Sequence, residues 1–122
     1  MQHKAAQAYG RTAQNTTNPR DLEANLLIKA ATRLQSVKEN WNDRGSDLDD
    51  ALFYNRQLWT IFVTSATRTE NPLPNQIKQN IANLGIFIFN QTLSMIRDPR
   101  PEKLNTLITI NREIAAGLRD SP

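Results

Sequence analysis

The sequence contains no cysteine and only one histidine among its 122 residues. The missing cysteine excludes disulfides, thiolate catalysis and cysteine-based metal sites together. Histidine is the side chain that ordinarily titrates near neutrality, and here it is confined to His3, close to the N-terminus. Because a zinc site needs three or four ligands from Cys, His or carboxylate side chains, we expect no metal site and no histidine-based catalysis.

Phosphate-binding loops and membrane spans are missing as well. The four glycines are isolated, whereas a phosphate-binding loop needs them clustered. The longest apolar run, GIFIF at 85–89, is far shorter than the roughly 18 residues needed to cross a bilayer. The first residues lack the apolar run of a secretion signal. We therefore expect a cytoplasmic protein that has no membrane contact and no cofactor and is not an enzyme.

Charge is balanced rather than concentrated. The chain has 15 basic and 12 acidic residues, a net charge of +3, and the two signs are interleaved. This pattern is typical of a solvated mixed-charge surface, because nucleic-acid binders usually gather Lys and Arg on one face. Three aspartates between positions 47 and 50 lack the spacing of a calcium loop. We interpret them as the charged N-terminus of a helix.

Apolar residues recur in steps of three and four through four segments, which predicts four amphipathic helices. The first begins at the Asn18-Pro19 capping signal and ends before the NDRGS sequence at 42–46. The second begins at Ser46 or Asp47, the third covers 75–97, and the last covers 104–118. GIFIF could form a strand by composition, but its flanks keep the helical period on both sides.

The sequence thus predicts an all-α fold, a small antiparallel bundle of four to five helices that forms a single domain over residues 1–122. Short connections favour antiparallel packing of successive helices. Residues 1–17 carry a thin apolar stripe interrupted by Gly10. This pattern fits either a weakly docked helix or a partly disordered N-terminal arm.

Residues in the middle of each apolar stripe are predicted to form the core. They are Leu27, Leu34, Trp59, Phe62, Ile81, Leu84 and Leu107. Asn55 is the polar member of the second stripe, so we expect it to face the seam between helices and to bond a neighbouring helix.

The 75–97 segment carries two apolar stripes, more than one side of a small bundle can cover. One stripe is assigned to the core. The other predicts a partner-binding groove centred on Ile86, Phe89 and Leu93, with Tyr54 and Leu58 of the preceding segment as its facing wall. In the alternative, the last helix or the N-terminal arm fills this space.

Three blocks of sequence carry a family resemblance. They are YNRQLWTIF at 54–62, NPLPNQIKQNIANLG at 71–85 and INREIAAGL at 110–118. With them the chain resembles the FlaF family, flagellar biosynthesis regulators of alphaproteobacteria, from Tyr9 to Leu118. The resemblance implies a role in promoting flagellin synthesis or secretion, opposite a negative regulator, FlbT.

The resemblance leaves two mechanisms open. In the first, the protein is a chaperone that binds the amphipathic terminal helices of flagellin before filament assembly. In the second, it regulates translation of the flagellin messenger RNA, directly or through FlbT. RNA readers usually show exposed aromatic rings among basic residues, and Arg56 beside Tyr54 is such a pair in this sequence. Because the sequence shows only this one pair of an aromatic and a basic residue, we favour flagellin over RNA as the partner.

Overall fold

A computed structural model describes residues 18–120, and every regular element in that range is helical. The helices are α2 (Pro19–Glu39), α3 (Asp47–Ala66), α4 (Asn75–Arg97) and α5 (Leu104–Arg119), with short 3₁₀ turns η1 (Trp41–Asp43) and η2 (Pro101–Lys103). The predicted all-α fold is confirmed, and 86–89 is helix rather than strand. The predictions for residues 1–17 lie outside the described range.

Local signals in the sequence explain where the helices begin. The Asn18 side chain accepts a hydrogen bond of 2.8 Å from the backbone N–H of Arg20, and Pro19 occupies the first helical position. Gly45, with φ at 50°, makes the left-handed turn before α3. Ser46 precedes α3 as predicted, but its side chain makes no capping bond. The three aspartates in the first turn of α3 instead complement the helix dipole.

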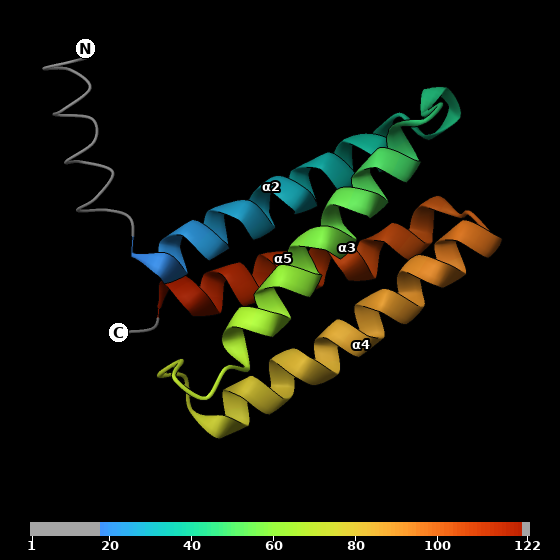
Figure 1. The fold of residues 1–122 in the computed structure, drawn as a ribbon. Coiled ribbons are helices and arrows are strands. Elements are labelled where there is room, and N and C mark those ends of the chain that lie inside the picture. Colours follow the sequence, from blue (N-terminus) through green and yellow to red (C-terminus); the bar gives the residue numbers. More distant parts are fainter. Residues whose placement is uncertain (1–17, 121–122) are drawn as a thin grey trace, which may run out of the picture.

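Successive helices run antiparallel, as predicted, but the four do not form a regular square bundle (Figure 1). α2 and α5 lie side by side and make the most extensive helix pair. α3 packs on α2, and α4 packs on α3. α4 lies at the edge of the molecule and diverges from α5 beyond the turn that joins them (Figure 1). This splayed position leaves much of the surface of α4 uncovered by other described helices.

The core lies between α2, α3 and α5 and extends to the inner face of α4. Six of the seven predicted core residues are buried: Leu27, Leu34, Trp59, Phe62, Ile81 and Leu107. Trp59 and Phe62 meet edge to face, with ring centroids 5.3 Å apart, a favoured aromatic geometry. The seventh, Leu84, is only half-buried. The inner face of α4 is formed by Ile81, Gly85, Ile88, Thr92 and Met95, so it passes beside Leu84 rather than through it.

Two asparagines form a polar chain inside this core. Trp59 Nε1 donates a hydrogen bond of 2.8 Å to Asn111 Oδ1, and Asn111 Nδ2 donates one of 2.7 Å to Asn55 Oδ1. Asn55 and Asn111 are both fully buried. The prediction that Asn55 faces the seam and bonds a neighbouring helix is therefore confirmed, and the chain links α3 to α5. Asn55 Nδ2 has no partner among the described residues.

α4 packs tightly against α3 at Gly85. A Cβ at this position would lie 2.7 Å from Cγ2 of Val63, which no carbon pair tolerates without movement. Val63 is β-branched and stiff at χ1, so its methyl group cannot easily swing away. The missing side chain of Gly85 thus sets the spacing between the two helices.

We expect Gly85→Ala to be less stable than the matched variant Gly117→Ala by about 1–3 kcal/mol, the usual cost of overpacking. Both changes gain the same helix propensity, about 1 kcal/mol, but a Cβ at Gly117 has no neighbour within 4 Å. Urea unfolding of both variants measures the difference. Adding Val63→Ala to both variants should remove this difference in stability. A difference that persists would mean that the new methyl group at position 85 clashes with a residue other than Val63.

Candidate partner-binding groove

An open groove runs between α3 and α4. On α3, its wall repeats at helical spacing through Asp49, Phe53, Arg56 and Thr60. On α4, the opposite wall rises from Phe89 to Ile96. The groove encloses a cavity of about 730 Å³, and its lining is Asp49, Leu52, Phe53, Arg56, Thr60, Phe89, Thr92, Leu93 and Ile96. Below, these residues are called the α3–α4 groove.

Large apolar side chains stand exposed along this groove. Phe53 is 52% exposed, Leu93 54% and Ile96 60%. Ile86, also 60% exposed, lies on the same side of α4 as Leu93 and continues the apolar stripe toward the N-terminus of that helix. Scattered exposed apolar residues are common, but a contiguous set along a groove is typical of an interaction surface.

The structure brings together only some of the predicted site residues. Phe89 and Leu93 line the α3–α4 groove, and Ile86 lies just beyond the cavity. Phe89 is half-buried and packs against the core, so it belongs to both. Tyr54 and Leu58, the predicted facing wall, do not line the groove.

Tyr54 and Leu58 lie on the side of α3 that faces α2. The Arg33 guanidinium of α2 lies 4.7 Å from the centre of the Tyr54 ring, and Lys29 Nζ lies 5.8 Å from it. Leu58 packs against the core. Each step along a helix turns by about 100°, so the residues one or two places away, Phe53 and Arg56, form the wall instead.

The wall residues that sequence reasoning missed could have been found. Phe53 and Arg56 share a stripe with Asp49 and Thr60, at i, i+4, i+7 and i+11. That stripe mixes an acid, an aromatic ring, a base and a hydroxyl, so it lacks the uniform apolar character of a core face. No residue of α5 lines the groove, so the last helix does not fill this space. The alternative in which the N-terminal arm fills it concerns residues 1–17, which lie outside the described range.

Two charged groups of the groove wall are unpaired within residues 18–120. Arg56 lies with its guanidinium carbon 5.8 Å from the centre of the Phe53 ring. Its backbone carbonyl accepts a hydrogen bond from Thr60 Oγ1. The guanidinium of Arg56 and the carboxylate of Asp49 make no hydrogen bond or ion pair in this part of the chain. Both are therefore available to a ligand of the groove.

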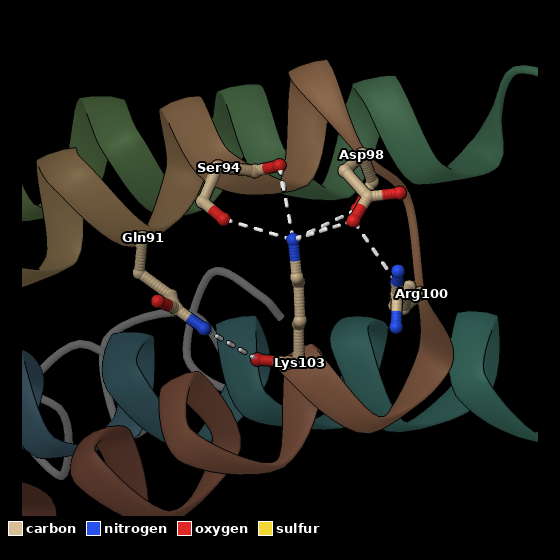
Figure 2. Close-up of polar contacts among 5 residues, drawn as sticks. All are labelled: Gln91, Ser94, Asp98, Arg100 and Lys103. Carbon is tan, nitrogen blue, oxygen red and sulfur yellow. Dashed lines mark hydrogen bonds and ion pairs between the residues drawn. The ribbon is translucent and has the colours of Figure 1, made fainter.

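The end of α4 is fixed to the start of α5 by a lysine (Figure 2). Lys103 Nζ donates to Ser94 Oγ at 2.9 Å and to the Asp98 carbonyl at 3.0 Å, and it lies 3.5 Å from Asp98 Oδ2. Gln91 Nε2 donates back to the Lys103 carbonyl, and Arg100 pairs with Asp98. A cation at a helix C-terminus complements the dipole. The contacts hold the turns of α4 that carry the C-terminal half of the groove.

Other hollows open elsewhere on the described surface. A second cavity, of about 550 Å³, lies beyond the other side of α4, between Ile77 and Ile114. Burial raises the pKa of the Glu23 carboxyl above its ordinary value, and the Arg20 guanidinium partly opposes this. Glu23 lines a separate pocket near the start of α2. Within residues 18–120, no cluster of His, Asp or Glu could hold a metal ion.

Comparisons with known proteins identify the chain. A family model described as flagellar protein FlaF matches residues 5–118, almost the whole sequence. No curated protein and no solved structure matches significantly. Among the described helices, none has the length and apolar character to cross a membrane. The match covers all four helices and the groove between two of them, and the chain therefore belongs to the FlaF family of flagellar proteins.

Proposed function

We propose that this protein is a cytoplasmic chaperone that binds flagellin and thereby promotes its synthesis and secretion, without catalysing a reaction. The observation that carries the proposal is the α3–α4 groove, which is open and exposes large apolar side chains on a protein of a flagellar family. The terminal segments of flagellin are amphipathic helices that lack their filament neighbours before assembly. Their exposed apolar faces are the surface that a chaperone must cover.

The groove has the form needed for such a helix. Recognition of an amphipathic helix in a groove uses apolar anchors at i, i+3, i+4 and i+7. Phe89, Leu93 and Ile96 present apolar atoms along two turns of α4, and Phe53 faces them from α3. A bound helix would remove this apolar surface from water, which is the main favourable term in association.

Leu93→Glu should weaken flagellin binding by at least about tenfold, as loss of a central apolar contact does. Leu93 is a better test than Phe89, because it is 54% exposed and its replacement leaves the core intact. Ile61→Glu is the matched control. Ile61 is 67% exposed on α3 and lies outside the groove. Calorimetric titration with purified flagellin measures both affinities, and thermal unfolding checks that both variants fold.

Two results would contradict the chaperone proposal. One is a wild-type protein that does not bind flagellin at all. The other is equal affinity of the Leu93→Glu and Ile61→Glu variants, which would move the binding surface away from the groove.

Regulation of the flagellin messenger RNA, directly or through FlbT, is the second candidate. Tyr54 with Arg33 and Lys29 joins an aromatic ring to two cations, the composition of RNA-binding surfaces. We rank it second because these cations already lie against the ring that a base would stack on. A flagellin pulldown with and without ribonuclease separates the two candidates. Capture that is lost after ribonuclease treatment would favour RNA.

A further inference from the structure

The α3–α4 groove carries one positive and one negative charge at a fixed spacing. Asp49 and Arg56 are seven residues apart on the same stripe of α3, which places them about two turns, or about 10 Å, apart along the helix axis. Neither side chain is paired within residues 18–120. Both share the groove with apolar side chains: Phe53 lies between them in the stripe, and Leu93 and Ile96 belong to the facing wall.

We infer that Asp49 and Arg56 select and orient the helix that binds in the groove. The ligand is an amphipathic helix that carries a carboxylate for Arg56 and a basic side chain for Asp49, seven residues apart beside its apolar stripe. This inference rests on the proposed function and deepens it, because it states which of many amphipathic helices the groove accepts.

Arg56 contributes most of the selectivity. A bound helix would exclude water from the guanidinium, and a charge that loses its water without gaining a partner is costly. A helix with an apolar or basic residue at that point is therefore rejected. A carboxylate can accept two parallel hydrogen bonds from the planar guanidinium, which a lysine ammonium cannot reproduce. The aromatic ring of Phe53 supports the guanidinium from one side.

The second charge determines direction. Residues seven apart lie on the same side of an α-helix, so one helix can meet both groups at once. A segment with its basic residue first lies parallel to α3, and a segment with its acidic residue first lies antiparallel. For a given ligand helix, one direction pairs its basic residue with Asp49 and its acidic residue with Arg56. The opposite direction brings like charges together at both positions. Like-charge opposition suppresses wrong pairings in interfaces.

The affinity of variants for purified flagellin tests the inference. The variants at the site are Arg56→Glu, Arg56→Gln and Arg56→Lys. The control is Arg112→Glu, because Arg112 is an exposed arginine of α5 outside the groove. We expect Arg56→Glu to weaken binding by about tenfold or more and Arg56→Gln by less, since reversal adds repulsion. The affinity of Arg56→Lys for flagellin should lie between that of the wild type and that of Arg56→Gln. Arg112→Glu should stay within about threefold of wild type, as an exposed charge outside the interface does.

Two further readouts identify the pair as electrostatic. Rising salt should weaken wild-type binding more than binding by Arg56→Gln, because salt screens the attraction between the unlike charges as the two partners approach. Flagellin variants with single Asp or Glu residues changed to Lys in the terminal helices should include one that restores binding to Arg56→Glu. That residue is the partner of Arg56.

The inference fails separately from the proposed function. If Leu93→Glu abolishes binding but Arg56→Glu binds like wild type, the groove is the site and the charge selection is wrong. If Arg56→Glu and Arg112→Glu weaken binding equally, the effect is one of net charge, and the selection is again wrong. If Leu93→Glu itself has no effect, both proposals are overturned.

Discussion

Truncation of Leu34 to alanine should lower the free energy of unfolding by about 2–5 kcal/mol, the range for large-to-small changes in a closed core. Leu34 is fully buried on the inner face of α2. α2 packs against both α3 and α5, so the helices on either side limit how far the site can collapse. Urea unfolding at equilibrium measures the loss.

Two leucines provide the comparison. Leu22→Ala, at a 48% exposed position of the same helix, should change stability by no more than about 0.5 kcal/mol. Leu84→Ala should fall between the two, because Leu84 is half-buried at the edge of the α4 contact. A loss at Leu84 equal to that at Leu34 would mean that Leu84 is buried more deeply than its half-buried position in the structure.

The helices could be predicted closely because their signals are local. Asn18 and Pro19 fix the start of α2 through one side-chain bond and one restricted dihedral. The helical period of 75–97 excluded a strand at GIFIF, whatever the preferences of those five residues. Each of these features depends on residues within one or two turns.

The placement of α4 could not be predicted in the same way. Periodicity tells which residues of a helix are apolar, but not which neighbour lies on which side. Tyr54 was therefore assigned to the wall facing α4, whereas it faces α2 beneath Arg33. The surplus of apolar residues on α4 was read correctly, since Ile86 and Leu93 are exposed. The identity of the opposite wall required the arrangement of the helices.

The polar chain in the core was predicted in part. Asn55 interrupts an apolar stripe, and a polar residue there needs a partner. Asn111 interrupts the apolar stripe of the last helix in the same way, because it lies between Leu107 and Leu118 on the buried face. The two interruptions could have been paired, because buried polar groups satisfy one another when no water reaches them.

Asn111→Leu should therefore destabilise the protein far more than Asn55→Leu. Loss of Asn111 leaves two groups unpaired in the core, Trp59 Nε1 and Asn55 Oδ1. Each orphaned group costs about 1–3 kcal/mol, so after the apolar gain from leucine we expect a net loss of about 2–4 kcal/mol.

Asn55→Leu is the matched control, with the same change of side chain at an equally buried position. It removes an amide whose Nδ2 already lacks a partner among residues 18–120, and it leaves the bond between Trp59 and Asn111 intact. One unpaired group is removed while Asn111 Nδ2 becomes another, and the apolar gain from leucine is the same in both variants, so Asn55→Leu should lose at least about 2 kcal/mol less stability than Asn111→Leu. Urea unfolding of both variants decides the matter. Equal losses would show that packing volume, rather than the hydrogen-bond chain, governs this part of the core.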